Sequence, residues 1–247
     1  MRSQSKRIPI TKALGSASED KFAEHAVVGV YASGSNNRFV RHVALLASEA
    51  NVSANAEVAV LHMGPPIVAG AESASAPGAA RTVHVHIVGD LALTIGERNA
   101  MKNWFAKVDK QQRPRQLFQQ YVVKPPMKWE HSEKGRKLFQ RFSCVGFVLE
   151  CYSAAGIEVI DSDAEFPEVD EQILRSAYPD IFKVEGTDKR VQDRLGFKGR
   201  GDLGVGGNGP WRIALAGYVF HSLERASTDS PRPQPFSPAS ISDACYP

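Results

Sequence analysis

Three residues that lie far apart in the chain have the types needed for nucleophilic catalysis: Cys144, His42 and His62. Cys144 precedes apolar residues at helical spacing, so it is predicted to open a helix that ends near Gly156. A thiol in the first helical turn faces unpaired backbone N–H groups and the positive end of the helix dipole. Both favour the thiolate, which is the nucleophile. Arg141 and other nearby basic residues are expected to lower the thiol pKa further.

The two histidines lie on neighbouring predicted strands. His42 is near the start of one strand and His62 is near the end of the next. If the strands pair as a hairpin, the two imidazoles become neighbours. A cysteine nucleophile needs a base to remove its proton, and that base needs a third group to fix its tautomer. Cys144, His42 and His62 are predicted to fill these roles in that order.

The elements that must position these residues change in type along the chain. Predicted strands come first, at 26–32, 39–47, 57–63 and 82–88. Helical patterns follow, at 97–108, 115–121, 132–140, 144–156 and 169–178. The stretches 48–56, 69–80 and 196–210 are predicted loops, and the apolar pattern of 211–224 fits a strand or a helix. Strands followed by helices favour an α+β fold in which an antiparallel sheet packs on helices.

The domain organisation follows from composition. Residues 25–225 of the 247 are predicted to form one domain, between a disordered segment at 1–24 and a disordered Ser/Pro-rich tail at 226–247. No apolar run approaches the roughly 18 residues of a membrane-spanning helix, so no transmembrane segment is expected. Three cysteines and no secretory signal favour free thiols and a cytoplasmic location. The Ser/Lys/Arg-rich start leaves an organelle transit peptide as an alternative.

Charge is distributed unevenly around Cys144, although the whole chain has a net charge of +3. Residues 98–141 contain 12 Lys/Arg and 3 Asp/Glu, a local net of +9. Residues 150–193 contain 4 Lys/Arg and 12 Asp/Glu, a local net of −8. The basic segment could contact an anionic ligand or a membrane surface, or the two segments could complement each other in the fold.

The histidine strands carry a family resemblance. Arg41-His42-Val43-Ala44-Leu45-Leu46, followed by Val60-Leu61-His62-Met63-Gly64-Pro65-Pro66, resembles the two histidine strands of lecithin retinol acyltransferase-like proteins. Cys144 follows His62 by 82 residues, as the order of that family requires. Ser143-Cys144-Val145-Gly146-Phe147 is more similar to the helix start of NlpC-type thiol hydrolases, a related group. The resemblance covers about residues 26–157.

The resemblance implies a papain-like fold of permuted order, with the histidine strands before the cysteine helix. It implies a thiol hydrolase or acyltransferase in which Cys144 attacks an amide or ester carbonyl and forms an acyl-thioester. His42 would be the base and His62 the orienting residue, and no cofactor is expected. The substrate could be a lipid, a peptide or a cell-wall fragment, because the membrane anchors of the acyltransferases are missing. The Cys144 backbone N–H could belong to an oxyanion hole.

Other patterns leave alternatives open. His221 follows Cys144 by 77 residues and is a rival base. His84 and His86 would share one face of a strand and could hold a metal in a His-based hydrolase. The same fold could instead be a non-catalytic binding module with a charge-split surface.

Two further patterns are weak indicators. The run from Gly199 to Gly204 matches a dinucleotide-binding fingerprint in letters, but it lacks the strand and helix that the motif requires. Aromatic residues interleaved with Lys and Arg over 104–121 could bind nucleic acid, but amphipathic helices produce the same pattern. Neither dinucleotide nor nucleic-acid binding is expected.

Overall fold

A central antiparallel sheet organises the computed structural model, which describes residues 20–22, 24–32, 40–52, 57–64, 67–73, 83–88, 93–115, 117–132, 134–184, 187–195, 199–224 and 235–244. The sheet has the strand order β6-β5-β3-β2-β7. Its strands are β2 (Val27–Ala32), β3 (Val40–Leu46), β5 (Glu57–Met63), β6 (Ile67–Ser73) and β7 (Val83–Val88). Together with the helices they form a mixed α+β fold, which confirms the predicted α+β class but not the papain-like order.

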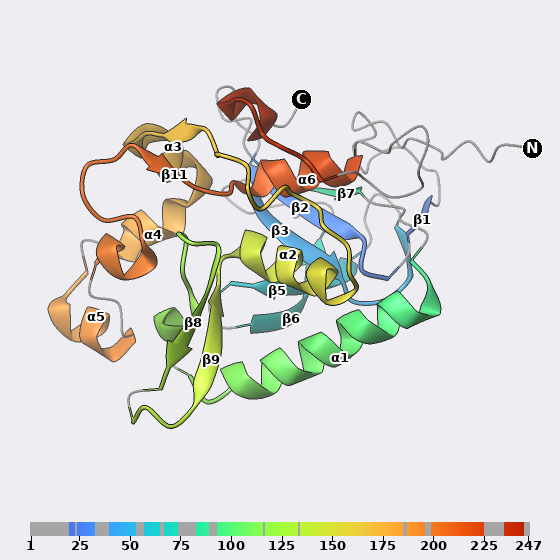
Figure 1. Ribbon diagram of the computed structural model, residues 1–247, viewed down its shortest axis with the longest axis horizontal. Helices are drawn as coiled ribbons and strands as arrows, with labels where there is room; N and C mark the ends of the chain where they lie inside the picture. Colours follow the sequence, from blue (N-terminus) through green and yellow to red (C-terminus); the bar gives the residue numbers. More distant parts are fainter. Residues whose placement is uncertain are drawn as a thin grey trace, which may run out of the picture.

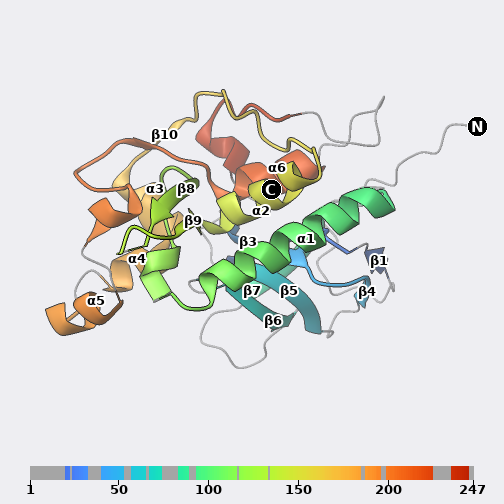
Figure 2. The ribbon, with the colours of Figure 1, turned by 60° about the horizontal axis from the view of Figure 1, so that its bottom comes forward.

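The helices α2 (Cys144–Ala154) and α6 (Ala216–Glu224) pack on one face of this sheet (Figure 1). Successive residues of a strand point to opposite faces, and Val43 and Leu45 of β3 belong to the core that contains these helices. A Cβ on Gly29, which is paired with Val43, would lie 2.5 Å from the Phe220 ring, so this glycine lets α6 approach. The helix α1 (Ile95–Gln112) runs beside α2 (Figure 2).

The start of α2 is fixed by several contacts. The side chain of Ser143 caps the helix by accepting a hydrogen bond from the Gly146 N–H at 3.0 Å. The Ser143 N–H donates to the Pro126 carbonyl at 2.8 Å. A Cβ on Gly146 would lie 1.9 Å from that carbonyl oxygen, so only glycine allows this approach. The helix ends as predicted, because Gly156 takes a positive φ of 72° after it.

Smaller elements surround the sheet and its helices. Three two-stranded sheets pair β1 (Asp20–Phe22) with β4 (Ala50–Val52), β8 (Met127–His131) with β9 (Leu138–Phe142), and β10 (Glu168–Val169) with β11 (Trp211–Arg212). The short helices are η1 (Leu117–Gln120), α3 (Glu171–Ala177), α4 (Pro179–Val184), α5 (Lys189–Leu195), η2 (Arg200–Leu203) and η3 (Ile241–Ala244).

Some predictions of element type are wrong. The segment 132–140, predicted as a helix, forms the turn of the β8–β9 hairpin and most of β9. Gly135 takes a positive φ of 64° there, and its N–H donates to the Ser132 carbonyl at 2.6 Å, which closes a turn. The predicted loops 48–56 and 69–80 contain β4 and most of β6, because strand pairing outweighs their weak local pattern. Residues 211–224 contain both a strand and a helix.

Residues 235–244, which lie in the segment predicted as a tail, pack on the domain. The Phe236 N–H donates to the Val159 carbonyl at 3.1 Å, and the Asp161 N–H donates to the Phe236 carbonyl at 3.0 Å. Ala244 is buried against α6, where a Cβ on Gly217 would lie 1.9 Å from its carbonyl oxygen. Within the described residues, no helix combines the length and the apolar character needed to cross a membrane. The predicted segment 1–24 falls almost wholly outside the described residues.

Candidate active site

The two histidines of the sequence pattern form a hydrogen-bonded pair. His42 Nε2 and His62 Nδ1 are 2.8 Å apart, and the rings meet edge to face with centroids 4.8 Å apart. Leu45 of β3 is paired with Leu61 of β5, so His62 stands level with Ala44 and diagonally across from His42, on the same face of the sheet. Burial lowers the pKa of His62. His62 is therefore neutral at neutral pH.

The strands β3 and β5 separate where this pair lies. Their register ends at Leu45 and Leu61, two residues before Val43 would face Met63. The Ala47 N–H donates to the Ala59 carbonyl of β5 at 2.8 Å. Hydrogen bonding alternates along an antiparallel strand, so the N–H of Val43 points toward β5 as well. Val43 thus directs its N–H into the gap between the separating strands, the β3–β5 gap.

The Cys144 sulfur lies near this gap. The backbone groups of Val43, Val145 and Cys144 itself and the Tyr121 hydroxyl are close enough to lower its pKa by hydrogen bonding. The Val43 interaction places the thiol beside the residue that follows His42. Three residues separated by as many as 102 positions, 42 to 144, thus converge at one end of β3.

The thiol and the imidazoles approach the β3–β5 gap from opposite faces. Val43 points to the face that carries α2, so His42, its neighbour in the strand, points to the other face. Among the described residues, the groups that hydrogen bond the sulfur are therefore backbone N–H groups and a tyrosine rather than an imidazole. The structure brings the two histidines together and brings the thiol to the same gap, but it does not form a thiol–imidazole hydrogen bond.

The Cys144 thiol is more strongly buried than its sequence suggests, with 1% of its surface exposed. Burial raises its pKa and outweighs the hydrogen bonds from Val43, Val145 and Tyr121, which lower it. The sequence predicts the opposite direction. Arg141, which the sequence predicted would lower the thiol pKa, contacts Glu130 and backbone carbonyls instead. In this state the thiol is protonated at neutral pH.

Tyr121 was not anticipated by the sequence pattern. Its hydroxyl interacts with both the sulfur and the backbone of Cys144. Burial and the Cys144 charge raise the Tyr121 pKa well above its usual value, so the hydroxyl keeps its proton and can donate it. The residue lies in a segment whose aromatic and basic pattern is typical of many amphipathic helices, and nothing in that pattern singles it out.

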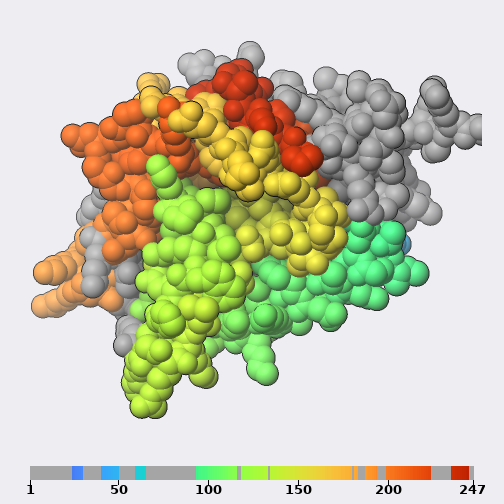
Figure 3. All heavy atoms as spheres, viewed as in Figure 1, coloured from blue at the N-terminus to red at the C-terminus, as the bar shows by residue number. Residues whose placement is uncertain are grey.

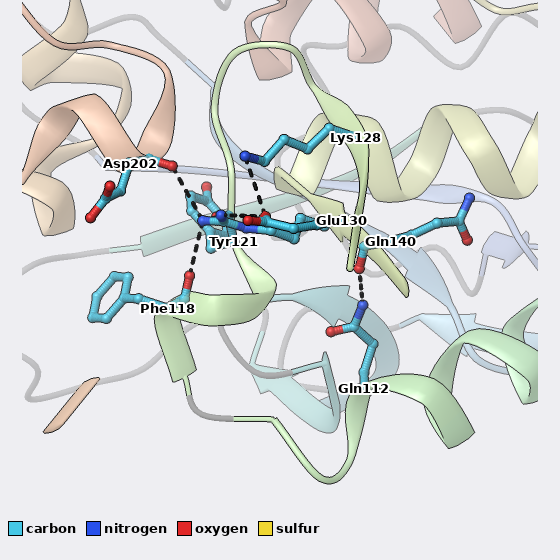
Figure 4. A network of polar contacts seen from close by, with 8 residues as sticks. Gln112, Phe118, Tyr121, Lys128, Glu130, Gln140 and Asp202 are labelled. Carbon is cyan, nitrogen blue, oxygen red and sulfur yellow. Dashed lines mark hydrogen bonds and ion pairs between the residues drawn. The ribbon is translucent and has the colours of Figure 1, made fainter. Parts of the chain in front are cut away.

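A buried guanidinium holds the backbone of Tyr121 in place (Figure 4). Arg141 Nε donates to the Tyr121 carbonyl at 3.0 Å, and Nη2 donates to the carbonyls of Phe118 at 3.2 Å and Asp202 at 3.3 Å. Its Nη1 pairs with Glu130 at 2.8 Å. Because β9 carries Arg141 and leads directly into α2, this network ties the position of Tyr121 to that of Cys144.

The small residue Gly64 leaves room for the imidazole pair. The register places Gly64 opposite His42, beyond the last paired position of β5. A Cβ on Gly64 would lie 3.2 Å from both His62 Nδ1 and His62 Cε1. Since Nδ1 is the atom that bonds His42, a side chain at position 64 would press on the pair itself.

The alternative sites gain less support. His221 lies on α6 with its ring edge-on to Phe220, and it is not among the groups that act most strongly on the Cys144 pKa. The strand β7 carries His84 and His86 opposite Tyr31 and Gly29, but their side chains lie outside the described part. Within the described residues, no group of three or more His, Cys, Asp or Glu side chains could hold a metal ion. The run from Gly199 to Gly204 contains η2. Among the described residues no strand directly precedes η2, so the context that a dinucleotide-binding motif requires is missing.

Comparison with protein-family models, with curated proteins and with solved structures finds no match to this chain. The family resemblance and the papain-like order therefore stay predictions.

Proposed function

We propose that this chain is a cysteine-dependent hydrolase or acyltransferase that acts on an amide or ester carbonyl through an acyl-thioester on Cys144. One observation supports the proposal above the others. The Cys144 sulfur lies beside the backbone of Val43, the residue that follows His42 in β3, and His42 is hydrogen bonded to His62, although the three residues come from different elements. The permuted papain-like order, with histidine strands before the cysteine helix, is part of the same proposal.

The imidazole pair supplies the roles of base and orienting group. His42 uses Nε2 in its bond with His62, so Nδ1 is the nitrogen that would take the thiol proton across the β3–β5 gap. His62 is neutral, and its Nδ1 can accept the Nε2–H of His42. This bond fixes the tautomer of His42 and stabilises the imidazolium that forms when the thiol is deprotonated.

The reaction then follows two balanced steps. The thiolate attacks the carbonyl carbon, a C–S bond forms, and the carbonyl electron pair moves to oxygen. The bond to the alcohol or amine breaks next, and that leaving group takes the proton from the His42 imidazolium. Water or another acceptor attacks the acyl-thioester with His42 again as base, and the thiolate is expelled.

Two donors near the sulfur would stabilise the developing oxyanion. They are the backbone N–H of Cys144, at the start of α2, and the hydroxyl of Tyr121. Because Cys144 is buried and its pKa is raised, the described state is a covered resting state. Substrate binding would widen the β3–β5 gap, displace the Tyr121 hydroxyl from the sulfur and let His42 reach the thiol.

The test is the alkylation rate of each cysteine as a function of pH, followed by peptide mass spectrometry in the native protein and in His42→Ala. We expect Cys144 to react faster than Cys151 near neutral pH, because both thiols are buried but groups beside Cys144 lower its pKa, while burial alone acts on Cys151. Loss of a general base typically costs about 10²- to 10⁴-fold, so the His42→Ala protein should react far more slowly at Cys144. An activated ester should add an acyl group to Cys144 in the native protein and not in Cys144→Ala. Equal alkylation of Cys144 with and without His42 would sink the catalytic proposal.

A specific surface favours a second candidate function, that of a module that binds anionic membranes. The β8–β9 hairpin projects from the molecule (Figure 3). It exposes Trp129, with 48% of its surface accessible, and Leu138, with 47%. Lys134, Arg136 and Lys137 are exposed near its turn. Aromatic and aliphatic side chains among cations are the combination that inserts into the interface of an anionic bilayer.

The membrane proposal is tested by sedimentation with phosphatidylcholine vesicles, with and without phosphatidylserine. We expect binding to the anionic vesicles that weakens with salt and is reduced in Trp129→Ala. Ile95→Ala is the matched control, because Ile95 is an equally apolar residue with 80% exposure on a different element. Equal loss in both variants, or equal binding to neutral vesicles, would contradict a role for the hairpin.

A further inference from the structure

We propose that Arg141 is a positioning residue for the proposed reaction: from β9 it holds the backbone of Tyr121 so that the Tyr121 hydroxyl reaches the Cys144 sulfur. This inference rests on the proposed function. Only 7% of the surface of Arg141 is exposed. A guanidinium withdrawn from water needs acceptors for its N–H groups, so the acceptors that it contacts are fixed relative to it.

The guanidinium holds both ends of one short turn (Figure 4). Residues 118–121 close this turn, because the Tyr121 N–H donates to the Phe118 carbonyl at 3.3 Å. Arg141 Nη2 donates to the same Phe118 carbonyl at 3.2 Å. Its Nε donates to the Tyr121 carbonyl at 3.0 Å, and Nη2 donates to that carbonyl as well. Hydrogen bonds from a charged group are stronger than those between neutral groups, so the backbone of Tyr121 has little freedom to shift.

The strand that carries Arg141 also leads to the proposed nucleophile. Phe142 forms a parallel bridge with Tyr121, and its carbonyl accepts the N–H of the residue after Tyr121 at 3.1 Å. Cys144 follows two residues later and opens α2. The Tyr121 ring is buried, and its hydroxyl interacts with the Cys144 sulfur. The side chain of Arg141 and the backbone of Phe142 therefore fix Tyr121 relative to Cys144 from two adjacent positions of β9.

Arg141 acts on the thiol through Tyr121 rather than through its own charge. It is not among the groups that act most strongly on the Cys144 pKa, whereas the Tyr121 hydroxyl is among them and lowers that pKa. The guanidinium charge is instead paired with Glu130 at 2.8 Å. Tyr178 also lies near the thiol, but its hydroxyl donates to a backbone carbonyl at 3.2 Å. The effect of Arg141 on the thiol should therefore disappear when the Tyr121 hydroxyl is removed.

Glu130 supports Arg141 from the surface of the β8–β9 hairpin. Lys128 is paired with Arg141 in the register, so Glu130, two residues further along β8, lies on the same face as Arg141. The Glu130 side chain is 40% exposed. Burial would raise the pKa of Glu130, but hydrogen bonds and charges from Arg141 and Lys128 lower it, so this carboxyl is ionised at neutral pH. Lys128 Nζ contacts the same carboxylate oxygen, Oε2, at 3.3 Å, so Lys128 belongs to the cluster without holding Arg141.

The test is the pH profile of alkylation of Cys144 and of Cys151, measured in the same sample by peptide mass spectrometry. Cys151 is buried on the same helix, so its alkylation rate reports any general opening of α2. The variants are Arg141→Lys, which keeps the charge but loses the planar fork, and Glu130→Gln, which keeps the shape of the side chain but loses its charge. Lys128→Gln is the matched control, because it removes the other cation that is paired with Glu130.

We expect the midpoint of the Cys144 profile to move to higher pH in Arg141→Lys, and by less in Glu130→Gln, because the Tyr121 hydroxyl is no longer held against the sulfur. Below the midpoint, the alkylation rate of Cys144 relative to that of Cys151 should fall by about tenfold in Arg141→Lys, the effect of losing one hydrogen bond to a charged group. The Cys144 profile should stay unchanged in Lys128→Gln. A purely structural role would instead raise the rates of both cysteines together and leave the midpoint in place.

The deciding measurement repeats Arg141→Lys in the Tyr121→Phe background, where it should add no further shift. An equal further shift there, no shift in Arg141→Lys alone, or the same shift in Lys128→Gln would overturn the proposal. Glu130→Gln takes the place of Arg141→Lys in these comparisons if the latter does not fold. Acyl transfer from an activated ester is measured in the same proteins. A shifted profile without acyl transfer in the native protein would refute the proposed activity alone, and acyl transfer with an unshifted profile would refute the role of Arg141 alone.

Discussion

At the scale of single residues, the environment of Cys144 shows burial competing with hydrogen bonding. Backbone N–H groups and a hydroxyl surround the sulfur and favour the thiolate, while the loss of water around it favours the thiol. Burial has the larger effect, so the thiol waits in its protonated form. If Cys144 is the proposed nucleophile, it needs a base when it reacts, and the proposed base is His42, whose neighbour Val43 contacts the thiol.

The Tyr121 hydroxyl is expected to tune the thiol directly. Its hydrogen bond lowers the Cys144 pKa, so Tyr121→Phe should raise that pKa and move the pH profile of Cys144 alkylation to higher pH. The measurement is the same alkylation assay between neutral and alkaline pH. Tyr178→Phe is the control, because the Tyr178 hydroxyl is also buried but donates to the Ala214 carbonyl at 3.2 Å. A shift to lower pH in Tyr121→Phe, or the same shift in both variants, would show that Tyr121 does not donate to the thiolate.

At the scale of elements, the site depends on where two strands separate and where one helix starts. The end of β3–β5 pairing leaves the Val43 N–H for the sulfur of Cys144. The start of α2 is set by the Ser143 cap and by the close approach of the Pro126 carbonyl to Gly146. A shift of either boundary by one residue would move the thiol away from the β3–β5 gap.

Gly146→Ala tests the helix start. The added Cβ would lie 1.9 Å from the Pro126 carbonyl oxygen, so the first turn of α2 must shift. We expect a loss of about 1–3 kcal/mol in the free energy of unfolding, measured by urea denaturation. Gly96→Ala is the control, because Gly96 lies in the first turn of α1 and the nearest atom to an added Cβ would be 3.9 Å away. There the better helix propensity of alanine should stabilise the protein, by up to about 1 kcal/mol. A neutral or stabilising effect of Gly146→Ala would contradict the described packing.

At the scale of the whole molecule, one buried side chain joins segments that are distant in sequence. Arg141 on β9 contacts the carbonyls of Phe118, Tyr121 and Asp202, so residues 118–121, the strand before α2 and η2 share one network (Figure 4). A second close contact supports it, because a Cβ on Gly204 would lie 1.7 Å from the Lys124 carbonyl oxygen. Residues 199–204 therefore support the segment that carries Tyr121. This structural role differs from the dinucleotide binding that their sequence motif suggests.

The separation of charge along the chain has a spatial counterpart. The β8–β9 hairpin presents part of the basic segment 98–141 at the surface, while Arg141 from the same segment is buried and neutralised by Glu130. In the acidic segment 150–193, Glu171 pairs with Arg175 at 2.6 Å and with Arg200, which lies outside the segment, at 3.5 Å. A net charge counted over a sequence window thus does not give the sign of the field at a site inside it, because pairing cancels some charges and exposes others.

Strong local patterns were sufficient for part of this fold. The apolar run after Cys144, with serine before it and Gly156 behind it, defines α2, and the alternating apolar residues define β2, β3, β5 and β7. The segment 132–140 misled because its charged residues suit an exposed helix as well as a hairpin. The strand at 138–142 forms because it pairs with residues 127–131, and this pairing cannot be seen in the local sequence pattern.

The sequence by itself determined that Cys144 opens a helix, that His42 and His62 lie on neighbouring strands, and that the fold is of the α+β class. These properties depend on residues within a turn or a strand of one another. Only the tertiary structure decided that the two imidazoles bond each other, that the thiol is buried with a raised pKa, and that Tyr121 covers it. Burial, strand separation and the face on which a side chain lies depend on contacts between segments up to 102 positions apart, 42 to 144, and those contacts exist only once the chain has folded.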